Sequence, residues 1–176
     1  MYIRETSDAD LKDILRVEGA AFEGGHEVEF TRALLVDPSA KPLLSLLAFI
    51  DDQPVGHILF TAARLVNSDV GVSFLAPLAV VPAFQRRGVG GCPIRDGLER
   101  LAGSGVGLVF VVGHPGYYPR HGFTQAGELG FETPYPFPEE HADAWMVCAL
   151  RPGVLGSVSG RVVCCDVLNK PELWQG

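Results

Sequence analysis

A glycine-rich turn between an apolar run and an amphipathic segment constrains the fold of this chain more than any other feature. Residues 72–80 are apolar and are closed by Val81-Pro82, and the loop Gln85-Arg86-Arg87-Gly88-Val89-Gly90-Gly91 follows. Beyond the loop, Ile94, Leu98 and Leu101 recur at helical spacing, and residues 107–112 form a second apolar run. Strand, turn, helix and strand in this order predict a right-handed crossover between two parallel strands.

Apolar runs elsewhere predict antiparallel strands around this parallel pair. Residues 43–50 and 55–60 are joined by the polar turn Asp51-Asp52-Gln53-Pro54, which predicts a hairpin. We expect further strands near residues 1–5, 144–150 and 160–166, and helices after the cap residues Thr6-Ser7-Asp8 and near 27–35. The expected fold class is α/β (α+β), with a mixed, mostly antiparallel central sheet flanked by helices.

The composition is that of one globular domain over residues 1–176, since 47% of the residues are hydrophobic and 20% are charged. No apolar run approaches the ~18 residues of a membrane span, and the N-terminus lacks a signal-peptide pattern. We therefore expect a soluble, cytoplasmic protein without a membrane partner. The net charge of −7 argues against a nucleic-acid partner. The acidic residues gather N-terminally, where they either attract an amine or form a solvated face.

The cysteines indicate neither a metal site nor a disulfide framework. They are Cys92, Cys148, Cys164 and Cys165, without a C-x-x-C pair and without a histidine at metal-ligand spacing. We expect reduced and mostly buried thiols, because free cysteine usually packs as a small apolar residue.

The loop itself has the chemistry of an anion site. Its glycines expose backbone amides at a helix N-terminus, and Arg86 and Arg87 add two full positive charges, so a phosphate or pyrophosphate is the natural ligand. A glycine turn used only for tight packing is the alternative. No Gly-Lys-Ser/Thr follows, which excludes a nucleotide P-loop, and the Gly-x-Gly-x-x-Gly dinucleotide pattern is not met.

At this loop the chain resembles the GNAT superfamily of N-acetyltransferases. The family motif Gln/Arg-x-x-Gly-x-Gly/Ala is matched by Gln85-Arg86-Arg87-Gly88-Val89-Gly90, and residues 75–82 are similar to the family strand that runs beside pantetheine. The resemblance implies acetyl-CoA as cosubstrate, no metal, and a parallel strand pair that splays at the coenzyme. The coenzyme-binding residues that it implies are Leu78, Ala79, Val80, Gln85, Arg86, Arg87, Gly88, Val89, Gly90 and Gly91.

A second motif supports the resemblance. Tyr117-Tyr118-Pro119-Arg120-His121-Gly122-Phe123 is similar to the family's aromatic-Tyr-x-x-x-Gly-Phe segment. By that match Tyr118 is the catalytic acid that protonates the departing thiolate, and a core aromatic is the alternative role. The resemblance also implies a ternary complex in which a neutral amine attacks the thioester directly, with a backbone amide at residues 78–80 facing the carbonyl oxygen.

The chain departs from the family pattern in two places. Cys92-Pro93 replaces small, helix-favouring residues after the last glycine, and no glutamate lies on residues 72–80, so the general base is unassigned. Candidates for the base are Glu23, Glu27, His114 or a water chain. His57 is expected to be packed or solvent-facing, and His121 receives no role.

The resemblance implies that the acceptor is a primary amine. The sequence does not choose between a small molecule, an antibiotic-like amine and a peptide N-terminus or lysine. We expect residues 20–35, 64–69 and 131–137 to build its site, with an ordinary core as the alternative role for the aromatic residues there. These are Phe22, Phe30, Tyr135, Phe137 and Trp145.

Three other functions compete with acetyl transfer from acetyl-CoA. One is a sensor that binds acyl-CoA without turnover, another is an acyltransferase that uses a different acyl-CoA, and the third is a structural protein with a glycine turn. A homodimer is compatible with all of them.

Overall fold

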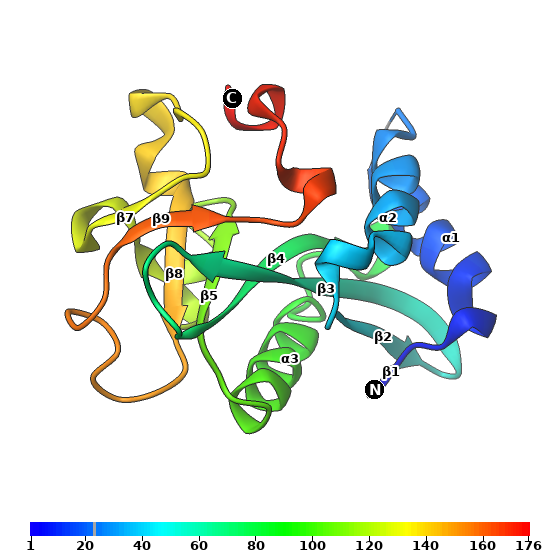
Figure 1. Cartoon of the computed structure of the whole chain (residues 1–176). Helices are drawn as coiled ribbons and strands as arrows, with labels where there is room; N and C mark the ends of the chain where they lie inside the picture. Colours follow the sequence, from blue (N-terminus) through cyan, green and yellow to red (C-terminus); the bar gives the residue numbers. More distant parts are fainter. Residues whose placement is uncertain (23) are drawn as a thin grey trace.

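The computed structural model describes residues 1–22 and 24–176. Figure 1 shows its arrangement of a twisted sheet with helices on both faces. The strands and α-helices are β1 (Tyr2–Glu5), α1 (Leu11–Ala21), α2 (His26–Val36), β2 (Leu44–Ile50), β3 (Gln53–Leu65), β4 (Gly71–Val80), α3 (Gly91–Gly103), β5 (Val106–Val112), β6 (Thr124–Gln125), β7 (Phe131–Glu132), β8 (Trp145–Ala149) and β9 (Gly160–Val163).

The sheet has the strand order β1-β2-β3-β4-β5-β8-β6, and β9 pairs with the far end of β3 and with β7. Along the main path, β4 and β5 are parallel and the other neighbouring pairs are antiparallel. The predicted hairpin is β2–β3, and the predicted crossover is β4–α3–β5. The expected mixed, mostly antiparallel sheet with a parallel pair at β4–β5 is confirmed, and β7 and β9 form a second, short parallel pair.

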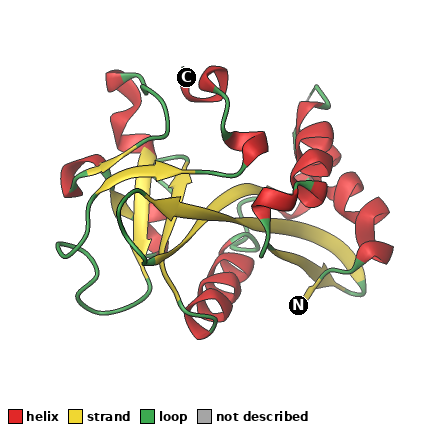
Figure 2. Ribbon diagram, viewed as in Figure 1, coloured by secondary structure: helices red, strands yellow, loops and turns green. Residues whose placement is uncertain are grey.

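The two faces of the sheet are covered by different helices (Figure 2). Ile58 and Phe60 of β3 pack with Ile94 of α3. Leu59, between them in sequence, packs instead in the cluster that includes Leu34 of α2. This period of two, set by the strand pleat, divides the core into an α3 side and an α2 side.

Helix α3 lies unusually close to the sheet because Gly97 carries no side chain. A Cβ on Gly97 would overlap the aromatic ring of Phe60. The close approach fixes α3 on β3 and therefore fixes the helix N-terminus that follows the glycine loop.

Two strand boundaries differ from expectation. Strand β3 continues to Leu65 rather than ending near Phe60, because its last residues pair first with β4 and then with β9. Strand β9 ends at Val163 rather than at Asp166. There the backbone leaves the ladder, and the Asp166 amide donates to Ser39 Oγ at 2.8 Å.

Asp37 ties the C-terminal segment to the end of α2. Its carboxylate accepts the Ser39 amide at 2.9 Å and the Val167 amide at 3.0 Å. Burial opposes ionisation of Asp37, but the hydrogen bonds from Val167 and Ser39 outweigh it, so the net pKa of Asp37 lies below its ordinary value. The short 3₁₀ helix Pro171–Trp174 is thereby held beside α2, with Trp174 buried.

No helix in the described part of the chain has the length and apolar character needed to cross a membrane. The same residues contain no cluster of three or more metal-ligating side chains. Cys148, Cys164 and Cys165 are buried free thiols, and Cys92 is partly exposed.

Candidate functional site

The pairing of strands β4 and β5 ends at Phe74 and Phe110, and we call the divergence of the two strands beyond these residues the fork. Their parallel pairing runs from Gly71 to Phe74 on β4 and ends there, although β4 continues to Val80. The pairing of β4 with β3 shifts register across Pro77, which has no amide hydrogen to donate. Beyond this register shift, the β4 backbone therefore has no hydrogen-bonded neighbouring strand on its β5 side.

The loop after β4 has the backbone shape of an anion-binding turn. Gln85 Nε2 donates to the Val80 carbonyl at 2.8 Å and so closes the loop onto the strand end. Arg86 and Gly88 have positive φ angles of 62° and 76°, and α3 begins at Gly91. Alternating left- and right-handed residues before a helix N-terminus form a concave nest of N–H groups, which binds anions.

A cavity of about 700 Å³ opens over this loop, and we call it the loop cavity. Arg86, Arg95 and Arg120 are among the residues that line it. Its walls are Leu78, Val80, Phe84, Gln85, Arg86, Gly88, Val89, Gly90, Gly91, Arg95, Tyr117, Arg120 and His121. Positive charge, free amides and apolar strand residues together suit an elongated ligand with phosphate at one end.

Two of the predicted coenzyme-binding residues do not line the loop cavity. Ala79 is 2% exposed and points to the opposite side of β4 from its neighbours Leu78 and Val80. Arg87 turns its guanidinium over the Phe84 ring at 5.7 Å from the centroid. The other predicted residues of the strand end and loop lie in the wall.

Sequence reasoning missed Phe84, Arg95, Tyr117, Arg120 and His121. His121 Nε2 is buried without a hydrogen-bond partner among the described residues. Burial lowers the pKa of His121, and the charges of Arg95 and Arg120 lower it further, so its imidazole is neutral at pH 7. Helical spacing offered a signal, since Arg95 lies in the second turn of α3 and faces the loop.

The predicted acid Tyr118 sits behind the cavity wall rather than in it. Its ring is 9% exposed and packs edge-to-face on Phe123, 5.5 Å between centroids. Gly113 at the end of β5 leaves room for this ring, because a Cβ there would overlap it. Burial raises the pKa of Tyr118 well above the ordinary value for tyrosine.

The candidate bases lie in different environments. His114 Nδ1 accepts the Gly116 amide at 3.1 Å within a turn, which gives this histidine a structural partner. His57 is completely buried, so of its two expected locations the packed one is correct. Glu27 lies on the first turn of α2 with one buried carboxylate oxygen, and Glu23 lies outside the described residues.

A second depression lies at the fork on the α2 side, and we call it the apolar hollow. It measures about 180 Å³ and is lined by Phe30, Phe74, Ala76, Val112, Leu168, Leu173 and Trp174. Val112 and Leu173 are 38% and 47% exposed, unusual for large apolar side chains. Of the aromatic residues named for the acceptor site, Phe30 alone lines this hollow, and Trp145 belongs to the core.

Comparison with known proteins decides the family. The model of the acetyltransferase (GNAT) family matches residues 11–131. The chain belongs to the GNAT acetyltransferase family. It is 46% identical over 165 residues to an uncharacterized N-acetyltransferase, YjhQ of Escherichia coli K12, covering 92% of this chain and 90% of that one. It is 28% identical to the uncharacterized N-acetyltransferase YhbS of Escherichia coli K12, covering 97% of this chain and 99% of that one.

Solved structures of GNAT proteins share the fold. The crystal structure of YhbS from Escherichia coli, in complex with CoA, matches with a TM-score of 0.86 and 26% identity over 96% of this chain and 92% of that one. A GNAT acetyltransferase from Brucella melitensis, in complex with acetyl-CoA, matches with a TM-score of 0.73 and 28% identity over 95% and 97%. The GNAT resemblance read from the glycine loop is thus confirmed.

Proposed function

We propose that this GNAT protein binds acetyl-CoA in the loop cavity and transfers the acetyl group to a primary amine. The observation that carries the proposal is the loop cavity itself, which is lined by the glycine loop and three arginines where β4 has no neighbour on its β5 side. The CoA and acetyl-CoA complexes of the two structural relatives support it.

The pyrophosphate is assigned to the nest at Gly88 and Gly90 and the pantetheine arm to the free edge of β4. An extended arm with amide groups can pair with a strand that has lost its neighbour, much as a peptide adds to a sheet edge. The thioester then reaches the fork, where a β4 amide at residues 78–80 is placed to stabilise the carbonyl oxygen as it becomes negative.

The acceptor approaches from the other face of the fork. The loop cavity is walled by Leu78 and Val80, whereas the apolar hollow is walled by Phe74 and Ala76 of the same strand. Acetyl-CoA and the amine, bound on opposite faces of the fork, can react with each other directly, without a covalent enzyme intermediate. Direct attack by a neutral amine then needs only positioning, an oxyanion donor, and an acid for the leaving thiolate.

We assign that acid to Tyr118. Its raised pKa keeps the phenol protonated at neutral pH, as an acid requires, although the same shift makes donation costlier. Tyr117, whose hydroxyl lies in the loop cavity, is the second tyrosine within the same motif.

Acetyl transfer is tested in an assay with two simultaneous readouts. The protein is incubated with acetyl-CoA and a panel of monoamines, polyamines, an aminoglycoside and short peptides, and both free thiol and the mass of each amine are measured. We expect amine-dependent thiol release with a mass gain of one acetyl group on at least one amine. Binding of acetyl-CoA without any amine-dependent release would identify a sensor, and preference for succinyl-CoA would identify a different acyl donor.

A further inference from the structure

Two carboxylate oxygens on neighbouring helices are buried without a hydrogen-bond partner among the described residues. They are Glu18 Oε1 on α1 and Glu27 Oε2 on the first turn of α2. A buried carboxylate oxygen that accepts no hydrogen bond has lost its water without replacement, which is costly. The pair therefore lacks a donor that a cationic ligand can supply.

A fixed polar network stands behind this pair. His57 Nδ1 lies 2.6 Å from Glu18 Oε2, and His57 Nε2 lies 2.9 Å from Ser45 Oγ. Glu18 and His57 are completely buried and Ser45 is nearly so. With the Ser45 hydroxyl donating to Nε2, the imidazole donates from Nδ1 to Glu18, so one oxygen of Glu18 is engaged and Oε1 is left open.

The charges that bear on Glu18 come from two elements. Burial raises the pKa of Glu18, the hydrogen bond and charge of His57 on β3 oppose that rise, and the charge of Glu27 on α2 adds to it. A Cβ on Gly19, next to Glu18, would lie 3.1 Å from Val28 Cγ2, next to Glu27, so α1 and α2 approach each other closely at the two glutamates.

The network lies on the acceptor side of β4. His57 pairs with Ala79, and directly opposed residues of an antiparallel pair point to the same face. Leu78 and Val80, on either side of Ala79, wall the loop cavity on the other face. One strand therefore separates the His57 network from the proposed coenzyme site.

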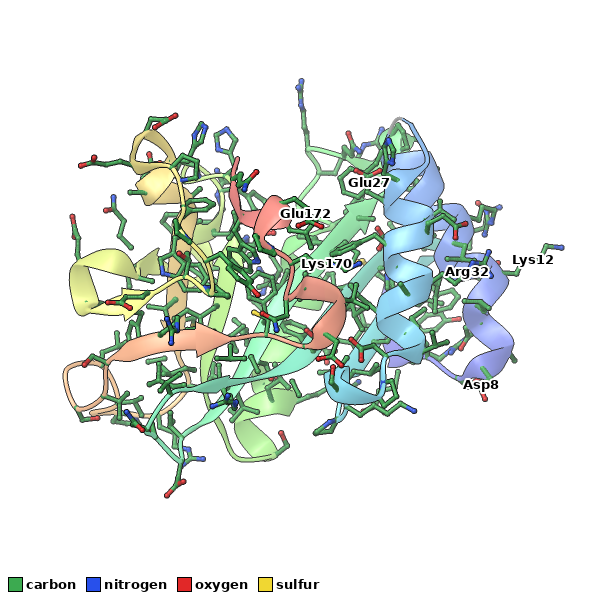
Figure 3. All side chains as sticks on the ribbon, turned by 45° about the horizontal axis from the view of Figure 1, so that its top comes forward. Asp8, Lys12, Glu27, Arg32, Lys170 and Glu172 are labelled. Atoms are coloured by element: carbon green, nitrogen blue, oxygen red, sulfur yellow. The ribbon has the colours of Figure 1, made fainter. Side chains whose placement is uncertain are left out.

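Glu27 also lies beside the apolar hollow. Phe30, which lines the hollow, follows Glu27 by three residues on α2, and residues at this spacing share a helix face. Figure 3 shows Glu27 at the end of α2 that is nearer the C-terminal segment carrying Glu172. That segment supplies Leu173 and Trp174 to the opposite wall of the hollow.

We propose that Glu27, positioned by Glu18 and His57, binds the ammonium group of an acceptor whose apolar body occupies the apolar hollow, and takes its proton. The proposal rests on the acetyl-transfer function proposed above and names its substrate class, a primary amine on an aromatic or aliphatic body. A polyamine or a polyhydroxylated amine finds no polar partner in the hollow walls.

The proton balance of the step is simple. The ammonium N–H bond breaks and a carboxyl O–H bond forms on Glu27, which leaves a neutral amine. The amine nitrogen then forms the amide bond as the thioester C–S bond breaks. Tyr118 gives its proton to the thiolate and is reprotonated by the second nitrogen proton, and Glu27 returns its proton to water. Glu18 and His57 act through Glu27 and are positioning residues.

The substrate class is tested with 2-phenylethylamine and hexylamine against spermidine and kanamycin, at equal free acetyl-CoA. We expect kcat/KM for the two apolar monoamines to exceed that for the polar amines by at least about tenfold, the effect of one or two buried methylene groups or more. Equal or better acetylation of spermidine or kanamycin, or no acetylation of either apolar amine, overturns the class. If a polar amine is acetylated the transferase proposal survives this failure, and if no amine in the wider panel is acetylated both fall.

The role of Glu27 is tested with Glu27→Gln and the matched variant Glu29→Gln, on the same helix but with its side chain 75% exposed. Loss of a general base typically costs about 10²–10⁴-fold, so we expect Glu27→Gln to lower kcat/KM for 2-phenylethylamine at pH 7 by that order, and the loss to shrink as the pH is raised and more of the free amine is neutral. Glu29→Gln should stay within about twofold of the parent, as exposed sites usually do. No loss in Glu27→Gln, or a loss that is the same at every pH, overturns the assignment.

The positioning role is tested in Glu18→Gln and His57→Gln, with acetyl-CoA affinity and the melting transition measured to show that each variant is folded. We expect folded Glu18→Gln to lower kcat/KM by about tenfold or more at unchanged acetyl-CoA affinity, and to have little further effect when it is combined with Glu27→Gln, because both residues act through one group. A folded Glu18→Gln that keeps the parent kcat/KM, or whose loss adds fully to that of Glu27→Gln, overturns the role of Glu18. If Glu18→Gln does not fold, His57→Gln gives the decision by the same comparison with Glu27→Gln.

Discussion

The rings of Tyr117 and Tyr118 meet edge to face with their centroids 5.1 Å apart, yet they belong to different environments. Tyr117 lines the loop cavity, and its hydroxyl oxygen lies 2.7 Å from the position that a Cβ on Gly90 would occupy. Tyr118 packs into the core on the α3 side. Adjacent residues thus place one tyrosine hydroxyl over the glycine loop and pack the ring of the other tyrosine into the core.

Replacing Tyr118 with phenylalanine tests the acid assignment. The change removes only the hydroxyl, so packing and acetyl-CoA affinity should persist while the leaving thiolate loses its proton donor. We expect kcat to fall by about 10²–10⁴-fold in single-turnover measurements. Tyr117→Phe is the matched variant and should weaken coenzyme binding more than it slows chemistry. If Tyr118→Phe reacts as fast as the parent in a single turnover, Tyr118 is a packing residue.

Gly97 should tolerate no side chain, because a Cβ there overlaps the Phe60 ring. We expect Gly97→Ala to lower the free energy of unfolding by about 1–3 kcal/mol, the usual range for overpacking a core. Gly103→Ala, on the same helix with open space around it, should be neutral or stabilising by up to about 1 kcal/mol. Denaturant unfolding of both variants compares them, and equal stabilities would contradict the close helix-to-sheet contact.

Asp37 should make the free energy of unfolding depend on pH in the acidic range. Its pKa in the folded protein lies below the ordinary aspartate value, so its contribution is present above the unfolded pKa and is lost as pH falls through the folded one. We expect Asp37→Asn to cost about 1–3 kcal/mol at pH 7, since the Val167 and Ser39 amides lose a charged acceptor. The difference between the variant and the parent should shrink below about pH 4, the ordinary range for aspartate. A difference that is constant with pH would count against these hydrogen bonds.

Activity should depend on no cysteine nucleophile. Cys148, Cys164 and Cys165 are buried, and burial raises the pKa of each thiol, which disfavours the reactive thiolate. Cys92, on the first turn of α3, is the exposed exception. We expect Cys92→Ala to change turnover by no more than a few-fold, with the three buried-site alanine variants corrected for stability. Isolation of an acetylated cysteine during turnover would instead establish a two-step route.

The strand-loop-helix-strand unit could be predicted because its signals are local. Gly88 and Gly90 predict the turn, Ile94 and Leu98 predict the buried face of the helix, and the handedness of the crossover follows from chain geometry. The same reasoning named Ala79 and Arg87, whose side chains do not line the loop cavity, because position in a motif does not determine which way a side chain points. Strand alternation buries Ala79, and stacking on Phe84 diverts Arg87.

What the sequence could not supply is contact between distant segments. Glu18 and His57 are 39 positions apart, and Ser45 joins them from a third element, so no spacing rule brings them together. The apolar hollow likewise combines α2 with a C-terminal segment that Asp37 anchors through backbone amides. Arg95 and Arg120 reach the loop cavity from separate elements, and their roles appear only when both are folded around Gly90.

The central claim is that acetyl-CoA binds in the cavity over Gly90, and calorimetric titration of acetyl-CoA tests it directly. The parent protein, Gly90→Val and Gly103→Val are compared at equal concentrations, with the melting transition of each measured first. A side chain at Gly90 must displace Tyr117 and fill the cavity, whereas Gly103 faces open space at the far end of the same helix. We predict that Gly90→Val weakens acetyl-CoA binding by more than about tenfold, or about 1.4 kcal/mol, and that Gly103→Val leaves it unchanged. Unaltered acetyl-CoA affinity in a folded Gly90→Val protein would contradict the account.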